Sequence, residues 1–238
     1  MRIIIVRHAE PDYVKDSLTE KGWREARLLA ERLKKIDVKA FYCSPLGRAK
    51  DTASFTLEKF GASAVELPWL TEFRGKIRKG LKLVSCWDRL PSEWTTNEDY
   101  YSAEKWKNTK LMKSANVSRE YKFVCDGIDS LLKSHGYEHV GRAYRVLDSN
   151  HDTIVLFCHF AVECVILSHI FSCSPMVLWH NFVALPSSVT TLISEEREEG
   201  TAVFRCQQFA DISHLYAGDE EPSFAARFCE CFDDDTRH

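Results

Sequence analysis

Arg2-Ile-Ile-Ile-Val-Arg-His-Ala-Glu10 is the stretch of sequence that decides the fold. Residues 3–6 form an uninterrupted β-branched run that is too short for a helix and apolar on both faces. Such a run is typical of a strand covered by helices on both sides, as in a parallel sheet. It ends in Arg7 and His8, and ligands of open α/β sheets bind beyond the carboxyl ends of the strands. The stretch therefore predicts an anion site that contains a nucleophile or a proton carrier.

A regular alternation of elements follows this strand. Apolar patterns predict strands at 38–43, 65–67 and 153–158 and helices at 19–35 and 44–60. A β-α-β-α-β order predicts parallel strands with right-handed crossovers, so we expect an α/β fold with a mostly parallel central sheet. Further helices are expected at 120–135 and 161–171, a strand at 140–147, and a hairpin of 189–194 with 202–208.

Local signals predict where the helices begin and end. Thr19 is expected to cap the first helix, and Ser44 the second, with Pro45 at the tolerated first helical position. Gly61 is expected to end the second helix. In the helix at 120–135, Phe123 is expected to face the core.

The segment 69–118 interrupts this rhythm. It is rich in aromatic residues and has few periodic apolar faces, and about fifty residues would form only a marginal core alone. We therefore expect a single catalytic domain at 1–215, with 69–118 as a partly helical cap insertion at one end of the sheet. Residues 216–238 are expected to form an acidic C-terminal tail.

Composition limits the classes of partner. The 238 residues carry a formal net charge of −3, so no global basic field points to nucleic acid or to an anionic membrane. No apolar run approaches the roughly 18–20 residues that span a bilayer, and no signal-peptide pattern is present. Nine cysteines without a Cys-x-x-Cys pair favour a reducing cytoplasm over a disulfide scaffold. Cys229 and Cys231 could bind a metal, but they lack further ligands nearby.

Three predicted strands end in residues suited to phosphate. Arg7 and His8 follow the first strand, Arg48 lies one turn after the second, and His159 follows the strand at 153–158. Parallel strands would bring these residues to one edge of the sheet, where arginine forks match phosphate oxygens and helix N-termini add donors. The alternatives are that the two arginines pair with Glu10 or Asp51 and that His159 is a core histidine.

These motifs together resemble the histidine phosphatase superfamily, which contains phosphoglycerate mutases and many phosphomonoesterases. The resemblance runs from residue 1 to about 210 and rests on Arg7-His-Ala-Glu10, Ser44-Pro-Leu-Gly-Arg-Ala49 with Thr52-Ala53, Leu70-Thr-Glu-Phe73, and Val155-Leu-Phe-Cys-His159. It implies a phosphoglycerate mutase-like three-layer α/β/α sandwich that acts on a small phosphorylated substrate.

The resemblance also implies roles for five residues. His8 would attack phosphorus and form a phosphohistidine. Arg7, Arg48 and His159 would hold the phosphoryl oxygens. Glu72 would protonate the leaving alkoxide and later activate water. No metal or other cofactor is expected, because the arginines supply the positive charge.

Several choices stay open at this stage. Glu66 and Glu93 are alternatives to Glu72 as the proton donor. Ala9 stands where mutases typically have Gly, an Asn expected soon after it is missing, and Phe73-Arg-Gly-Lys-Ile77 lacks the Arg-Tyr-Gly-type signature, so we favour a phosphatase over a mutase. A non-catalytic phosphate-binding module is the alternative of another class.

Other features have a plainer interpretation beside the functional one. The basic run at 74–82 is typical of a solvated face, and its alternative role is recruiting an anionic substrate. Trp179-His180 could line the pocket or simply pack, and Trp87, Trp94 and Trp106 are expected in the core of the cap. The oligomeric state stays open, although an exposed strand edge or cap surface could support a dimer.

Overall fold

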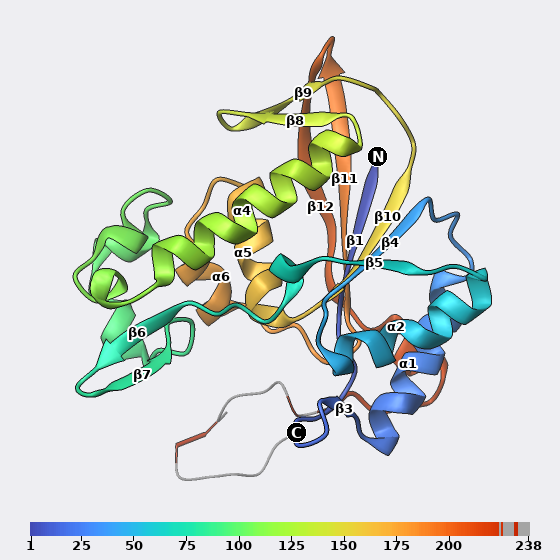
Figure 1. Ribbon diagram of the computed structural model, residues 1–238, viewed down its shortest axis with the longest axis horizontal. Helices are drawn as coiled ribbons and strands as arrows, with labels where there is room; N and C mark the ends of the chain where they lie inside the picture. The colour runs from blue at the N-terminus through green and yellow to red at the C-terminus, as the bar shows by residue number, and fades with distance from the viewer. Residues whose placement is uncertain (224, 226–230, 233–238) are drawn as a thin grey trace.

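A mixed eight-stranded sheet forms the centre of the computed structural model, which describes residues 1–223, 225, 231 and 232 (Figure 1). The strands follow one another across the sheet in the order β5 (Ala64–Glu66), β4 (Ala40–Cys43), β10 (Thr153–Cys158), β1 (Arg2–Arg7), β11 (Val189–Glu198), β12 (Thr201–Asp211), β9 (Ala143–Val146) and β8 (Tyr137–Val140). The first four strands are parallel, and the β11–β12 and β8–β9 hairpins add an antiparallel half.

The alternation of side chains along β1 creates the layers on either side of the sheet. Ile4 and Val6 belong to the core beneath α1 (Glu20–Leu33) and α2 (Gly47–Phe60). Ile3 and Ile5 belong to the larger core beneath α4 (Val117–Ser134), α5 (Phe160–Ile170) and α6 (Pro175–Asn181). In Figure 1, α4–α6 lie to the left of the sheet and α1 and α2 to the right. The predicted three-layer α/β/α fold is confirmed, but the central sheet is mixed rather than mostly parallel, because the β11–β12 and β8–β9 hairpins extend it with antiparallel strands.

The register of the parallel strands sets the position of the candidate site. Arg7 pairs with Cys158 of β10, and Phe157 of β10 pairs with Cys43 of β4. The three strands therefore end together, and the residues that follow them meet at one edge of the sheet, as the sequence predicts.

Helix ends follow the predicted signals at two of three positions. The Thr19 hydroxyl accepts a hydrogen bond from the backbone N–H of Gly22, and Gly61 ends α2 in the left-handed conformation with φ of 57°. The prediction for the start of α2 is wrong for both Ser44 as the cap and Pro45 as the first helical residue: α2 begins at Gly47 and its N-cap is Leu46, which makes no side-chain cap bond. The reason is that the Ser44 hydroxyl bonds the ring of His159 instead.

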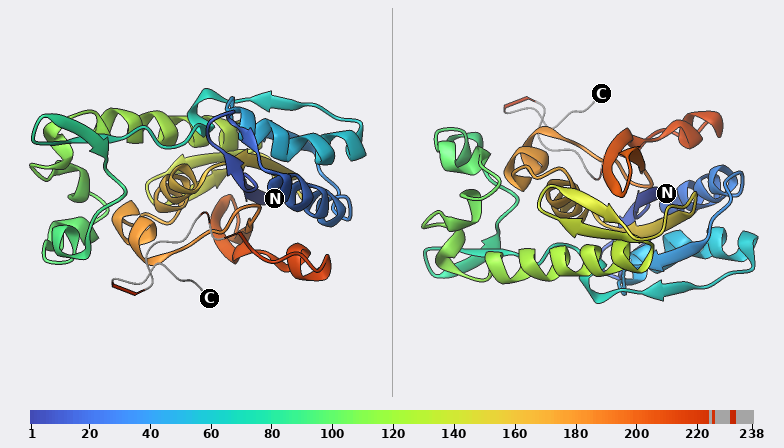
Figure 2. Two further views of the ribbon diagram at one scale, coloured as in Figure 1. Left: turned by 90° about the horizontal axis from the view of Figure 1, so that it is seen from below. Right: turned by 90° about the horizontal axis from the view of Figure 1, so that it is seen from above.

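The segment 69–118, which we expect to be a cap insertion, is partly helical and also holds a small hairpin. It contains β6 (Lys76–Lys79), β7 (Lys82–Ser85), α3 (Pro91–Trp94) and the short 3₁₀ helices η1 (Pro68–Leu70), η2 (Glu98–Tyr101), η3 (Trp106–Asn108) and η4 (Met112–Ser114). Both views of Figure 2 place this segment (green) at the end of the molecule opposite α1. Trp94 and Trp106 are buried in the main core and Trp87 is half-buried against it, as predicted.

Smaller elements complete the chain. The strands β2 (Pro11–Asp12) and β3 (Ser17–Leu18) pair with each other after β1, and α7 (Ser213–Ala217) packs on α1. Lys21 and Arg24 of α1 form ion pairs with Glu220, so the start of the expected tail contacts the domain. Cys229 and most of the tail lie outside the described residues, so the interpretation of Cys229 and Cys231 as metal ligands has no structural test.

Two sequence predictions are wrong in this part of the fold. The segment 140–147 is not one strand, because the chain turns at Gly141, with φ of 67°, and forms the β8–β9 hairpin. Phe123 does not face the core: 48% of its surface is exposed on the outer side of α4. No helix among the described residues is long and apolar enough to cross a membrane.

Candidate active site

His8 stands at the end of β1 with one ring nitrogen already engaged. The ring is 2% exposed, and Nδ1 lies 2.8 Å from the carbonyl oxygen of Ala9. A carbonyl oxygen can only accept, so Nδ1 carries the hydrogen and Nε2 keeps its lone pair. Burial, followed by the nearby charges of Arg7 and Arg48, lowers the pKa of His8 well below 6.5. His8 is therefore a neutral imidazole with a free Nε2 at neutral pH.

His159 lies beside His8 at the end of β10. The two ring centroids are 5.1 Å apart, and the Ser44 hydroxyl is 2.8 Å from His159 Nε2. Among the described residues, the buried Nδ1 of His159 has no hydrogen-bond partner. Burial also lowers the pKa of His159 well below 6.5, so the ring is neutral. The unsatisfied nitrogen is available to a ligand.

Arg7 lies beneath the site and is almost fully buried. Its Nη1 donates to the backbone oxygen of Ala184, and its guanidinium lies 6.0 Å from the ring centre of Phe160. Within the described chain, the buried Nε has no partner. Burial lowers the pKa of Arg7 below its usual value, while the negative charge of Glu72 opposes this effect. The fixed guanidinium keeps donor capacity for an anion.

Arg48 occupies the first turn of α2 and is held by the loop before β3. Its Nη1 lies 2.6 Å from Asp16 Oδ1, and the other carboxylate oxygen accepts from the Gly47 N–H at 2.7 Å. Tyr13 stacks on the guanidinium at 5.5 Å. Glu10 and Asp51, the alternative partners that the sequence offers for the arginines, bond other residues: Glu10 accepts from Thr19, and Asp51 accepts from Ser17. Arg48 is thus aligned by a neighbour that leaves its buried Nε unpaired among the described residues.

Glu72 joins the cap to the N-terminus of α5. Its Oε1 accepts hydrogen bonds from the backbone N–H of Phe73 at 2.9 Å and of Ala161 at 3.1 Å. Burial raises the pKa of Glu72 above 4.5, and these two donors with Arg7 and Arg48 pull it back only in part. A carboxyl group with a raised pKa can carry a proton closer to neutral pH.

The alternative glutamates lie elsewhere. Glu66 is at the end of β5, paired with Lys50 at 2.6 Å. Glu93 is in α3, where its carboxylate pairs with Arg89 at 2.6 Å and Lys79 at 3.1 Å. Both glutamates are thus held by cations outside the site, whereas the charges of both site arginines act on Glu72. The geometry favours Glu72 over both.

The other predicted residues have structural surroundings. The basic run lies on the β6–β7 hairpin, and its side chains at 74, 78, 79 and 82 are exposed, as expected for a solvated face. Trp179 is buried, donates to the Ala161 carbonyl and stacks on Phe73 at 5.4 Å, and His180 stacks on Trp94 at 4.9 Å. These two residues pack the cap against α6.

Sequence reasoning missed several residues that support the site, because they come from distant parts of the chain. Asp16 orients Arg48, and Ala184 in the loop before β11 binds Arg7. Glu163 is fully buried on α5; Thr190 donates to it at 2.5 Å, and burial raises its pKa to about 7. Glu25 accepts from the Glu10 N–H at 2.8 Å, and burial raises its pKa to about 7 as well. No local pattern distinguishes these residues from ordinary surface or helix positions.

Comparison with known sequences identifies a family. The model of the histidine phosphatase superfamily (branch 1) matches residues 3–207. A 2,3-bisphosphoglycerate-dependent phosphoglycerate mutase of Thermoplasma acidophilum is 35% identical over 130 residues, which are 49% of this chain and 65% of that enzyme. The match therefore spans just under two thirds of the length of this relative.

Solved structures share the fold. A variant of phosphoserine phosphatase from Entamoeba histolytica, in complex with phosphoserine, superposes with a TM-score of 0.60 at 19% identity, covering 90% of this chain and 98% of that one. A mycobacterial glucosyl-3-phosphoglycerate phosphatase gives 0.57 at 18% identity, with 87% and 98% covered. The α-ribazole phosphatase of Shigella flexneri gives 0.54 at 17% identity, with 87% and 95% covered.

Proposed function

We propose that this chain, which belongs to the histidine phosphatase superfamily, hydrolyses phosphomonoesters through a phosphohistidine formed on His8. The observation that carries the proposal is the hydrogen bond from His8 Nδ1 to the Ala9 carbonyl. It fixes the ring so that Nε2 has a lone pair, and the lowered pKa keeps that nitrogen unprotonated. An activated nucleophile of this kind is what a covalent route requires.

The first half-reaction transfers the phosphoryl group to the enzyme. His8 Nε2 attacks phosphorus, the N–P bond forms, and the P–O bond to the leaving group breaks. Glu72 in its protonated form gives its proton to the leaving oxygen and becomes a carboxylate. Arg7, Arg48 and the free Nδ1 of His159 bind the phosphoryl oxygens, where charge has to be stabilised.

The second half-reaction restores the enzyme. The Glu72 carboxylate accepts a proton from water, the water oxygen attacks phosphorus, and the N–P bond breaks. Inorganic phosphate leaves, His8 regains its lone pair, and Glu72 is protonated again. The two half-reactions together consume only the phosphomonoester and water. Arg7 and Arg48 supply the positive charge that stabilises the phosphoryl oxygens.

A phosphate-release assay tests the proposal. Wild-type protein and His8→Ala are compared on p-nitrophenyl phosphate with a metal chelator present. We expect turnover by the wild type that the chelator leaves intact and that the variant loses. Turnover by well-folded His8→Ala equal to that of the wild type would contradict the role of His8.

A mutase is the second candidate, and the 35% identical relative favours it. A mutase returns the phosphoryl group to a phosphoglycerate instead of to water. Incubation with 3-phosphoglycerate and 2,3-bisphosphoglycerate separates the two: net release of inorganic phosphate supports the hydrolase, and interconversion of phosphoglycerates without release supports the mutase.

We propose that the enzyme works in the cytoplasm and acts on a small phosphorylated substrate. The relatives named above act on small phosphate esters according to their names, and this motivates the substrate class. Cys43, Cys86, Cys125, Cys158 and Cys164 are buried with free thiols. Such thiols persist best in a reducing compartment.

A further inference from the structure

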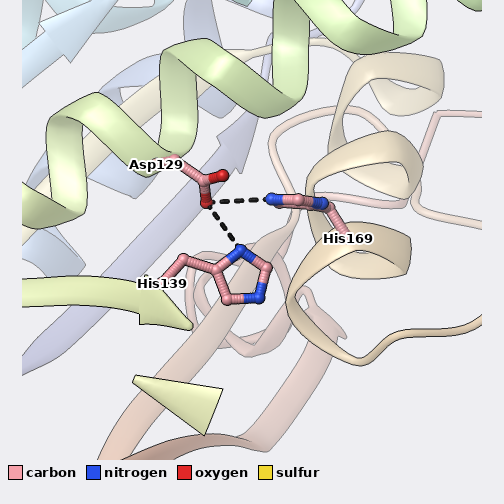
Figure 3. Close-up of side chains that lie close together, drawn as sticks. All are labelled: Asp129, His139 and His169. Carbon is pink, nitrogen blue, oxygen red and sulfur yellow. Dashed lines mark hydrogen bonds and ion pairs between the residues drawn. The ribbon is translucent and has the colours of Figure 1, made fainter. Parts of the chain in front are cut away.

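A second cluster of chemically active side chains lies far from His8. Asp129 of α4, His139 of β8 and His169 in the last turn of α5 converge on one point (Figure 3). Asp129 Oδ1 is 2.8 Å from His169 Nε2 and 3.1 Å from His139 Nδ1. His159 is the N-cap of α5 and His169 lies in its last turn, ten residues later and about 15 Å along the helix axis, so the cluster is separate from the proposed catalytic site.

The spacing of the three atoms suits a metal ion. All three lie within 4.8 Å of one another. Zinc bound tetrahedrally by nitrogen and oxygen at about 2.0–2.1 Å would set neighbouring ligand atoms about 3.3 Å apart. The distances of 2.8 and 3.1 Å from Asp129 Oδ1 to the two imidazole nitrogens therefore need to open by only a few tenths of an ångström. Both rings already direct a nitrogen at the same carboxylate oxygen (Figure 3).

The packing around the cluster holds the rings in place. His139 stacks on Tyr144 with 4.9 Å between centroids, and the two imidazole rings meet edge to face at 4.6 Å. The histidine side chains are 13% and 18% exposed, so they are largely shielded from water without being sealed from it. Because packing already fixes the two imidazole rings, their side chains lose little conformational entropy when a ligand binds.

A cavity of about 490 Å³ opens onto the cluster and is lined by both histidines. The cationic side chains on its wall are engaged: Lys122 pairs with Asp126, and Arg142 pairs with Glu104. Lys107 lies over the ring of Tyr121 at 5.1 Å. None of these three cationic side chains pairs with Asp129, whose carboxylate contacts the two histidines. The cavity, which both histidines line, offers an entry path and room for a water ligand.

We propose that Asp129, His139 and His169 bind one divalent transition-metal ion, zinc in preference, whose fourth coordination position faces the cavity. Two imidazole nitrogens and one carboxylate oxygen suit zinc, whereas magnesium and calcium select sites made of oxygen. The ion would join α4, the β8–β9 hairpin and α5, which at this point are linked by the contacts of Asp129 with the two histidines.

The test is metal binding by the full-length protein without an affinity tag, after treatment with a chelator and its removal. Zinc is titrated by calorimetry into the wild type, His139→Gln, His169→Gln and Asp129→Asn. His151→Gln is the matched control, since His151 is exposed and outside the cluster. His8→Ala is a second control, because it tests whether the paired histidines of the active site bind the ion instead.

We expect one zinc ion per chain in the wild type and in both controls. Each of the three cluster variants should bind more than about 100-fold less tightly, beyond the effect of losing an outer-shell partner. Cobalt should give visible d–d bands without a thiolate charge-transfer band. No binding by the wild type, unchanged affinity in the cluster variants, loss of binding in His8→Ala, or a thiolate band would each overturn the proposal. None of these readouts depends on phosphatase activity.

Discussion

Substitution of Glu72 by glutamine is the perturbation that separates its proposed roles most clearly. The amide oxygen of glutamine can accept the same hydrogen bonds from Phe73 at 2.9 Å and Ala161 at 3.1 Å, so the local structure should survive. Glutamine lacks the acidic proton that Glu72 is proposed to give to the leaving oxygen. A positioned general acid contributes about 10²–10⁴-fold to a rate, or roughly 2.7–5.4 kcal/mol of the barrier.

The effect of this substitution should depend on the leaving group. An alkoxide leaves poorly without a proton, so kcat/KM for an alkyl phosphate should fall by about 10²–10⁴-fold. p-Nitrophenolate leaves unaided, so its release should be much less affected in the first turnover. Because water activation is also lost, the phosphorylated enzyme should accumulate and give a burst of p-nitrophenol equal to the enzyme concentration.

Stopped-flow absorbance measures the burst, and steady-state phosphate release measures the alkyl substrate. Glu66→Gln and Glu93→Gln are matched controls, since both glutamates form ion pairs outside the site. Equal losses on aryl and alkyl substrates in Glu72→Gln, or a control that reproduces its behaviour, would refute the assignment of Glu72 as the proton donor.

Three further predictions follow from the same structure. Since burial and the arginines lower the pKa of His8 well below 6.5 and burial raises that of Glu72, kcat/KM should be highest on the acidic side of neutrality and should fall as Glu72 deprotonates; a pH profile whose acidic limb has its midpoint at or above pH 6.5 would contradict this. Folding raises the pKa of Glu25 from 4.5 to about 7. The folded state therefore binds this proton more tightly, so Glu25 favours folding at low pH, and this stabilisation is lost as the pH rises from 4.5 to 7. From pH 4.5 to 7 the free energy of unfolding should fall by on the order of 3 kcal/mol more in the wild type than in Glu25→Gln, and equal pH dependence in urea titrations would argue against it. Gly47→Ala would place a Cβ 2.1 Å from the backbone oxygen of Asp16, so it should destabilise the protein by about 1–3 kcal/mol and raise KM by displacing the start of α2; an unchanged Tm and KM would show that the helix shifts freely.

The sequence predicts the parts of this protein that depend on local or periodic patterns. The β-branched run of residues 3–6 defines β1 because an apolar strand of that length has to be covered on both faces. The parallel order then brings His8, Arg48 and His159 together, because parallel strands end at the same edge. The proximity of these three residues can therefore be predicted from the sequence alone.

Long-range competition explains what the sequence does not predict. Ser44 followed by proline has the pattern of a helix start, yet its hydroxyl bonds His159, which is 115 residues away in the chain. Asp16 and Arg48 are likewise joined only by the fold. The Asp129 cluster draws on three elements separated by hairpins and helices, so no spacing in the sequence indicates it.

The most direct test of the account is to identify the phosphorylated residue. Wild type and Glu72→Gln are mixed with p-nitrophenyl phosphate, quenched within the first turnover under alkaline conditions, and analysed by intact and tandem mass spectrometry. We predict one acid-labile phosphate per chain on His8, accumulating most in Glu72→Gln and missing from His8→Ala. Phosphate on any other residue, or a burst without a phosphorylated enzyme, would contradict the proposed phosphohistidine mechanism.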